Sequence, residues 1–474
     1  MLFNSFSFLL FFPLVCLLYW TIRTIGGEKS LPLRNTFLLV CSYYFYMCWQ
    51  PKYALLLLLS TALTYGASII IENCKSSRKK DFCLGTAIIL NLTILFFYKY
   101  YGFVTETIVS MMSTIGISIN IPGLELLLPV GISFYIFQAL GYSIDVYRGE
   151  IKPERNFITY ALFVSFFPQL VAGPIERSTN LLKQFKEDHP FNYKYTMSGF
   201  KLMLWGYFMK LCMADRAALY VDHVFNSLDN HEGYSTLIAS LMFTLQIYGD
   251  FAGYTFIAIG CARILGFSLH DNFNRPYFAV SITDFWRRWH ISLSSWLRDY
   301  VYFPLGGSRT TKQKTYRNIL VTFGISGLWH GANWTFIVWG FLHGFIQCIE
   351  RTLGYNRKEW HSMIKMIHIV VTLFIVNLTW MLFRADSLSD ALKAFIQMIS
   401  PSGTTIIDIK VAVASMGIVV CIVMIKEFIE EFYPNALNSF QSSFVTNYLW
   451  PIFLLVSIGC FGVFEGGQFI YFQF

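Results

Sequence analysis

Long apolar stretches without a charged residue recur along this 474-residue chain. Such runs occupy, for example, residues 6–22, 35–50, 53–71, 83–98, 157–175, 366–383, 411–425 and 445–463. Runs of this length cross the hydrocarbon core of a bilayer when they are helical, whereas a β-barrel would show shorter alternating segments. The whole chain is 55% hydrophobic and only 14% charged, too apolar for a hydrated surface. We expect an all-α polytopic membrane protein with roughly 10–12 spanning or re-entrant helices.

Basic residues between the first runs predict the orientation. Arg23, Lys29 and Arg34 flank the first connection, four basic residues lie within 75–80 in the third, and only Lys52 lies in the second. The positive-inside rule then places the first and third connections in the cytoplasm and the N-terminus outside.

The first run should remain as a helix, because neither a basic residue before it nor a small-residue cleavage site marks a signal peptide. Basic loops facing anionic lipid explain the net charge of +8, so no nucleic-acid partner is expected.

The cysteine pattern and the lack of repeats bear on the domain organisation. Most of the ten cysteines lie inside apolar stretches and no C-x-x-C pair occurs, so we expect neither a disulfide framework nor a metal site. No internal repeat or long polar insertion is evident. A single membrane domain over 1–474 is therefore predicted.

The segment FWRRWHISLSSWLRDY, residues 285–300, is basic and rich in tryptophan. At helical spacing its apolar residues share one arc, and Ser281 with Asp284 forms a capping box just before it. One interpretation is an interfacial helix whose arginines contact lipid phosphates. The other is a helix folded into the protein, with His290 turned inward toward a cavity for an anionic ligand. Periodicity does not separate these two interpretations.

A second signal is the stretch from 318 to 349, which contains no Asp, Glu, Lys or Arg but holds His330 and His343. A histidine at membrane depth persists when it is paired, neutral or functional. His330 is either a neutral general base or a histidine bonded to a neighbouring helix. Asn333 follows it on the same helical face, whereas a structural role is favoured for His343.

Six sequence blocks occur in the following order: LPVGISFYIFQALGYSIDVYRGE (128–150), FFPQLVAGPIER (166–177), NRPYFAVSITDFWRRWHISLSSWLRDYVYFPLGGSR (274–309), GLWHGANWTFIVWGFLHG (327–344), FRADSL (383–388) and FIYFQF (469–474). Together they resemble the membrane-bound O-acyltransferase (MBOAT) family. Within it they are similar to the bacterial branch of the alginate O-acetylation membrane protein. The resemblance covers nearly the whole chain and implies a helical bundle around a central tunnel, with a motif-bearing core at about 128–350.

The resemblance also implies roles for particular residues. His330 matches the family's catalytic histidine near the middle of the membrane, and His290 matches its partner on the cytoplasmic side of the tunnel. The surroundings of the substrate would include Asn333, Arg287, Arg288, Trp289, Asp250 and Tyr254. Phe256 and Ala252 depart from the family pattern, which usually has Asp and Ser there, so the acceptor could differ from alginate.

The expected reaction is acyl transfer, with acetyl the favoured group, in the bacterial cytoplasmic membrane. The donor would be a cytoplasmic thioester, either acetyl-CoA or an acyl carrier, and no bound cofactor is expected. The acceptor would be a hydroxyl of an exported glycan or an extracytoplasmic hydrolase-like O-acetyltransferase partner. His330 would accept the hydroxyl proton, His290 would orient the donor or carry the proton, and Asn333 would donate a hydrogen bond to the oxyanion or hydroxyl.

Several alternatives remain open at this stage. Within the family they are D-alanyl transfer to teichoic acid and peptidoglycan O-acetylation. From other classes, the protein could be a solute transporter or flippase, or a scaffold that recruits an extracellular transferase. Neither of these would need His330 as a base.

Overall fold

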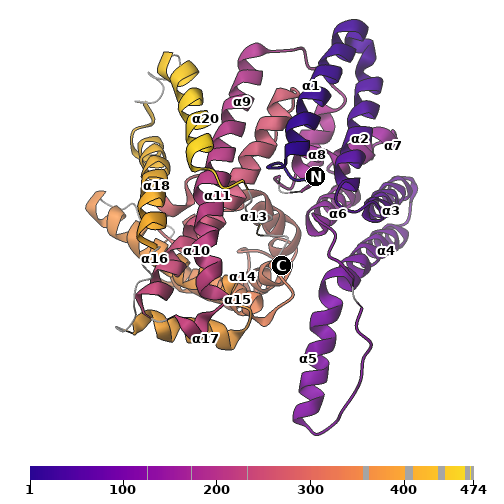
Figure 1. The fold of residues 1–474 in the computed structure, drawn as a ribbon. Helices are drawn as coiled ribbons and strands as arrows, with labels where there is room; N and C mark the ends of the chain where they lie inside the picture. Colours follow the sequence, from indigo (N-terminus) through magenta and orange to yellow (C-terminus); the bar gives the residue numbers. More distant parts are fainter. Residues whose placement is uncertain are drawn as a thin grey trace. The chain divides into compact units, whose positions relative to one another are not determined.

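The computed structural model describes residues 1–124, 126–171, 173–231, 233–355, 362–400, 409–435, 444–464 and residue 470. Within these ranges the regular structure is helical and no strand occurs, which confirms the all-α fold (Figure 1). The chain forms two compact units. Unit 1 contains residues 1–200 and 258–270, and unit 2 contains residues 201–257 and 271–474.

Unit 1 is built from the N-terminal helices. These are α1 (Phe6–Gly26), α2 (Leu31–Met47), α3 (Tyr53–Asn73), α4 (Ser77–Leu95), α5 (Tyr101–Thr114), α6 (Ile132–Arg148), α7 (Phe157–Ser165) and α8 (Phe167–Leu170). Helix α6 packs against α3, α4 and α7, and nearly all of its side chains are buried. Helix α5 extends away from the other helices of this unit (Figure 1).

Ion pairs tie the first two helices of unit 1 to a later loop. Asp188 accepts hydrogen bonds from Arg23 Nε at 2.9 Å and from the buried Arg34. Burial alone would raise the pKa of Asp188, but the hydrogen bonds from both arginines outweigh that effect and lower it. The connection between α1 and α2 is thus fixed by a charge cluster.

Among the described residues, four helical segments are long and apolar enough to cross a membrane: Phe6–Met47, Tyr53–Asn73, Ser77–Thr114 and Met363–Arg384. Two shorter apolar helical segments, Phe157–Leu170 and Val445–Phe461, are also present. These segments confirm the polytopic membrane character of the chain. The larger number of spans and the central tunnel stay predictions.

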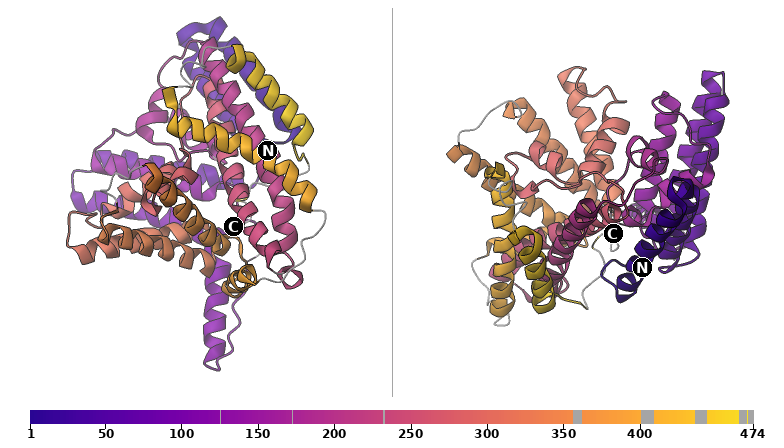
Figure 2. Two further views of the ribbon diagram at one scale, coloured as in Figure 1. Left: turned by 90° about the vertical axis from the view of Figure 1, so that its left-hand side faces the viewer. Right: turned by 90° about the horizontal axis from the view of Figure 1, so that it is seen from above.

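Unit 2 holds the later helices. These are α10 (Asp215–Phe225), α12 (Ile282–Arg288), α13 (Ile291–Leu297), α14 (Lys312–His330), α15 (Trp334–Thr352), α16 (Ser362–Arg384), α17 (Leu388–Ile399), α18 (Ile409–Phe432) and α20 (Trp450–Phe461). Helices α9 (Tyr193–Tyr207) and α11 (Tyr234–Ile264) contribute residues to both units. Helices α14 to α17 pack one against the next and can be followed by their salmon to orange colours in Figures 1 and 2.

Glycines allow α14 and α15 to pack closely. A Cβ on Gly327 would lie 2.2 Å from the carbonyl oxygen of Phe336, and a Cβ on Gly340 would lie 2.3 Å from that of Phe323. Small residues at such crossings let two helix backbones approach within a membrane. Because His330 is the last residue of α14, this crossing fixes its position beside α15.

Candidate functional site

His290 lies in a break between two short helices. The expected single helix over 285–300 is wrong: α12 ends at Arg288 and α13 begins at Ile291. His290 itself has a φ of 45°, in the left-handed region that non-glycine residues rarely adopt. Its side chain is fully buried. The interpretation that folds this segment into the protein with His290 turned inward is therefore the one that fits.

Asn272 explains why the helix breaks at this point. Its side-chain oxygen accepts a hydrogen bond from Ser292 N at 3.1 Å, and its backbone oxygen accepts one from Ile291 N at 3.0 Å. These contacts satisfy the first N–H groups of α13, as a helix cap does. Before the break, the predicted cap is confirmed, because Ser281 accepts a hydrogen bond from Asp284 N.

Asn272 also fixes the tautomer of His290. A backbone N–H only donates, so the bond from Ser292 N identifies the Oδ1 of Asn272 as the acceptor. His290 Nδ1 lies 3.2 Å from the same oxygen and must donate to it. The neutral ring therefore carries its proton on Nδ1, and its Nε2 presents a lone pair.

His330 lies close to His290, with 6.3 Å between the ring centroids. It is buried at the end of α14. Trp329 and Trp339 each contact its ring edge-on at 5.1 Å, and Phe383 contacts it at 5.4 Å. Trp329 also contacts His290 at 5.5 Å. The structure thus brings the two predicted histidines together within a shared aromatic environment.

A cavity of about 450 Å³ is lined by sequence neighbours of both histidines, although neither histidine lines it. Ile291, the residue after His290, lines it, and so does Ser326, one helical turn before His330. Arg287, Arg298 and Arg351 line the same cavity. Arg298 is paired with Asp299 at 2.8 Å, and the guanidinium groups of Arg287 and Arg351 suit a ligand with several anionic oxygens, because each presents a fork of donors.

Arg288 and Trp289, which follow Arg287 in the sequence, do not line this cavity. Arg288 donates to Asp284 at 3.1 Å and to Glu431 at 2.9 and 3.1 Å. Burial alone would raise the pKa of Glu431, but hydrogen bonds from Arg288 and Arg275 outweigh it and lower the pKa. Trp289 is fully buried among aromatic rings, including that of Phe273 at 5.0 Å. Both residues support the break at His290. Of the three consecutive residues 287–289, only Arg287 lines the cavity.

Asp250 and Tyr254, both on α11, belong to a buried charge cluster. Lys210 Nζ lies 2.7 Å from both Asp250 and Asp215, and 5.3 Å from the centre of the Tyr254 ring. The second oxygen of Asp250 accepts a hydrogen bond from Ile470 N at 2.7 Å. Removal of one member of such a cluster costs about 3–5 kcal/mol, so a structural role accounts for these residues. A role of Asp250 and Tyr254 in the tunnel stays a prediction.

Phe251, the residue after Asp250 in the charge cluster, contacts one member of the histidine pair. Its ring contacts His290 edge-on at 4.7 Å. The two departures from the family pattern lie on the same helix, where Ala252 is buried and Phe256 is half-buried.

Asn333 lies outside the helix that carries His330. We expected it on the same helical face, but α14 ends at His330 and Asn333 caps the start of α15. Its side-chain oxygen accepts from Thr335 N at 3.0 Å, and its Nδ2 donates to the carbonyl oxygen of Asp386 at 2.8 Å. Both the oxygen and the nitrogen of the Asn333 side-chain amide are therefore hydrogen-bonded to main-chain groups.

His343 is held as a structural residue. Its Nδ1 accepts from Trp286 Nε1 at 3.2 Å, so its Nε2 carries the proton and lies 3.0 Å from Thr379 Oγ1. Thr379 in turn donates to the carbonyl oxygen of Val376 at 2.9 Å. This geometry agrees with the structural role favoured from the sequence.

Sequence reasoning missed Asn272, Lys210 and the two further arginines of the cavity. Asn272 lies in the polar segment HDNFNRP before the tryptophan-rich motif, and Lys210 is a lone cation in the apolar stretch GYFMKLCMA. Both were visible as polar residues in unusual places, but their partners are remote in the sequence. In the part of the chain that the structure describes, no group of His, Cys, Asp or Glu side chains could hold a metal ion.

The fold and the site define a helical membrane protein with a buried histidine pair and an arginine-containing cavity lined by sequence neighbours of the pair. Residues 149–385 match the family model of the membrane-bound O-acyltransferases. The chain is 38% identical to a probable alginate O-acetylase of Pseudomonas aeruginosa, over 84% of this chain and 75% of the relative. It is 32% identical to a peptidoglycan O-acetyltransferase of Helicobacter pylori, over 100% and 98% of the two chains.

A more distant relative is a teichoic acid D-alanyltransferase of Bacillus subtilis, which is 27% identical over 54% of this chain and 68% of its own. These comparisons agree with the resemblance seen in the sequence blocks. The chain belongs to the membrane-bound O-acyltransferase family and is an acyltransferase.

Proposed function

We propose that the protein transfers acetyl groups from a cytoplasmic thioester to hydroxyls of an exported polysaccharide, directly or through an extracytoplasmic partner transferase. The observation that carries this proposal is the proximity of His290 and His330, together with an arginine-containing cavity that is lined by their sequence neighbours. Two histidine rings this close can act on the same reacting group. That arrangement is suited to base catalysis on a substrate held in place.

In the proposed step, His330 accepts the proton of the acceptor hydroxyl. The hydroxyl oxygen then attacks the thioester carbonyl carbon, the C–S bond breaks, and the leaving thiolate takes the proton back from His330. His290 presents its Nε2 lone pair, because Asn272 holds the proton on Nδ1, and it orients the donor or carries the proton. A donor role for Asn333 would require its amide to leave Asp386.

The cavity supports a thioester donor with phosphate groups. Both coenzyme A and the phosphopantetheine arm of an acyl carrier carry phosphate, and Arg287 and Arg351 offer complementary charge. A volume of about 450 Å³ also lies within the usual range for a small-molecule site. We assign Arg287 to donor binding and Arg288 to support of the break at His290.

The acceptor is proposed from the relatives. The names of the Pseudomonas and Helicobacter relatives specify alginate and peptidoglycan, and both polymers present sugar hydroxyls. Peptidoglycan is a specific second candidate, because the Helicobacter relative aligns along the full chain. The weaker and partial match to the D-alanyltransferase gives D-alanyl transfer less support.

We place the protein in the bacterial cytoplasmic membrane with its N-terminus outside. The basic residues near 23–34 and 75–80 support this orientation. A donor inside the cell and an acceptor outside it then require the acetyl group to cross the membrane through the protein. A transporter or scaffold would leave the buried histidine pair without a function.

Inverted membrane vesicles test the direction and chemistry of transfer. Vesicles from a strain lacking the gene would carry either the wild type or His330→Ala, and receive radiolabelled acetyl-CoA or acetyl-acyl carrier protein at the cytoplasmic face. Base-labile label should accumulate on luminal glycan with the wild type and fall by about 10²–10⁴-fold with the variant. Equal labelling by both proteins would overturn the proposal.

A further inference from the structure

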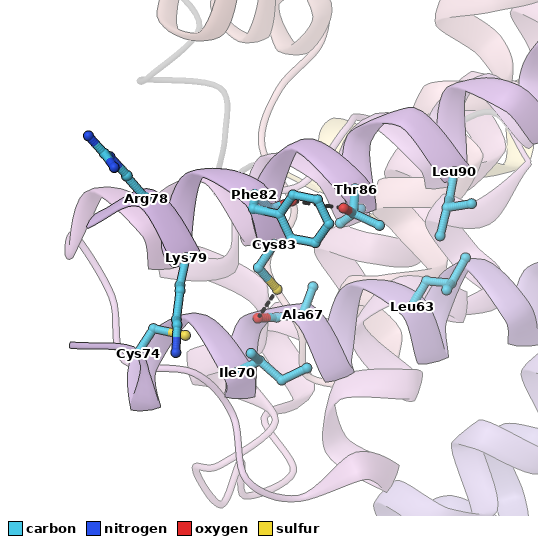
Figure 3. Close-up of a pocket in the computed structure, with 11 residues that line it drawn as sticks. Leu63, Ala67, Ile70, Cys74, Arg78, Lys79, Phe82, Cys83, Thr86 and Leu90 are labelled. Atoms are coloured by element: carbon cyan, nitrogen blue, oxygen red, sulfur yellow. Dashed lines mark hydrogen bonds between the residues drawn. The ribbon is translucent and has the colours of Figure 1, made fainter. Parts of the chain in front are cut away.

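Helices α3 and α4 enclose a second cavity, far in sequence from the histidines. It has a volume of about 560 Å³ and is lined mainly by apolar side chains (Figure 3). Leu63, Ala67 and Ile70 contribute from α3, and Phe82, Ala87 and Leu90 contribute from α4. Both helices belong to segments that are long and apolar enough to span a membrane. Because Ile70 and Leu90 in its lining are 54% and 42% exposed, the groove faces the hydrocarbon part of the bilayer.

One end of this groove is basic. Arg78 and Lys79, in the first turn of α4, line it beside Cys74. Figure 3 shows Lys79 extending from α4 toward Cys74, the residue after α3, while Arg78 projects outward at the same end. The connection between the two helices lies here, so this end marks the membrane surface.

The neighbouring carboxylates are engaged elsewhere. Asp81 accepts a hydrogen bond from the Tyr147 hydroxyl, and Glu72 pairs with Arg155. Within the described ranges no carboxylate forms an ion pair with Arg78 or Lys79. Their positive charges are thus available to an external anion.

The length of the groove corresponds to one leaflet. Eleven residues of helix separate Lys79 from Leu90, a rise of roughly 17 Å. The hydrocarbon core of a bilayer is about 30 Å thick, so one leaflet accounts for about 15 Å. A lipid whose headgroup lies at the basic end would extend one acyl chain along the apolar part.

We propose that this groove is a binding site for one anionic glycerophospholipid. Its phosphate lies at Lys79 and Arg78, and one acyl chain lies between Leu63 and Leu90. Charge complementarity selects an anionic headgroup, and the apolar walls select a chain rather than a free phosphate. In the proposed orientation, the site faces the cytoplasmic leaflet, where anionic lipids meet basic loops.

Native mass spectrometry of the purified full-length protein tests this site. Phosphatidylglycerol, phosphatidylcholine and diacylglycerol would be added separately at matched chain length. We expect the first bound phosphatidylglycerol to be retained about tenfold more than the other two. The double variant Arg78→Gln/Lys79→Gln should remove this preference. The matched control Lys75→Gln/Lys80→Gln removes the same charge from the same segment, outside the groove, and should keep it.

Two results would overturn the proposal. One is a wild type that retains phosphatidylglycerol no better than the other two lipids. The other is an equal loss of phosphatidylglycerol retention in both double variants, which would indicate a general attraction of anionic lipid to the basic loop. A second measurement is independent of the charge variants. A phosphatidylglycerol with a photoreactive acyl chain should crosslink to peptides containing residues 82–90, and Thr86→Trp, which fills the groove, should reduce this yield. Crosslinks distributed evenly over the other helices would contradict the site.

Discussion

The Nδ1 of His290 lies 3.2 Å from the Oδ1 of Asn272, the same oxygen that accepts a hydrogen bond from the backbone of Ser292. This relationship couples the backbone break between α12 and α13 to the proton position on the histidine. Asn272 is thereby a positioning residue for His290. The Ser292 hydroxyl also donates to this oxygen, so a Ser292 variant can separate that bond from the effect of Asn272 on His290.

Replacement of Asn272 should lower activity through His290. In Asn272→Ala the imidazole loses the acceptor that fixes its tautomer, and we expect acetyl transfer to fall about 10–100-fold, as for residues that orient functional histidines. Asn272→Asp keeps an acceptor and should restore most of the rate. Ser292→Ala removes the 2.9 Å hydroxyl bond to the same oxygen but leaves the His290 contact in place, and it is the matched control. An alanine variant as active as the wild type would exclude this role.

Adjacent arginines should show different defects. Arg287 lines the cavity, so Arg287→Gln should raise the KM for the thioester donor by about tenfold and change kcat less. Arg288→Gln breaks the contact with Glu431 and should lower the thermal stability, with the KM nearly unchanged. Steady-state kinetics and thermal unfolding of both purified variants distinguish the two cases. Identical kinetic defects in both would refute the assignment of Arg287 to the donor.

The close crossing of α14 and α15 predicts a steric effect on His330. Gly327→Ala would place a methyl group 2.2 Å from the Phe336 carbonyl oxygen, so the helices must separate. We expect a stability loss of about 1–3 kcal/mol together with reduced acetyl transfer. In Gly324→Ala the nearest atom is the ring of Phe341 at 3.0 Å, which is a side chain. This control should be milder in both assays, and the reverse order would contradict the packing described here.

The charge cluster in unit 1 predicts a pH-dependent stability. The folded pKa of Asp188 is below its ordinary value of 3.8, so its stabilisation is present above that pH and is lost as the pH falls through the folded pKa. Asp188→Asn should destabilise the protein at neutral pH, because Arg34 stays buried without its carboxylate, at a cost of about 3–5 kcal/mol. Thermal unfolding in detergent between pH 7 and pH 3 measures this. Wild type and variant with parallel pH profiles would argue against the prediction.

The sequence predicted the helical membrane fold and the cap at Ser281, and it singled out His290 and His330, which the structure brings close together. Hydrophobic periodicity fails at His290, because local pattern carries no information about Asn272, whose contacts terminate one helix and start the next. It fails at Asn333 for a similar reason, since the glycine at 331 and the cap at 333 end α14 where the apolar pattern continues.

Remote partners explain the remaining differences. Arg287 and Arg288 are adjacent in sequence, yet one lines a cavity and the other pairs with Glu431, 143 residues away. Lys210 likewise pairs with Asp250 on another helix. Such pairs depend on tertiary packing, which the spacing of residues within one segment does not encode.

The most direct test of the central claim is the amount of ester-linked acetate on cell-surface and secreted glycan. A strain lacking the gene would be complemented with the wild type, His330→Ala or His343→Gln, and the membrane level of each protein would be measured by blot. The account predicts that acetate is lost with His330→Ala at normal protein level, and that His343→Gln retains acetate in proportion to its level. Unchanged acetate with His330→Ala would contradict the account and leave His330 with a structural role only.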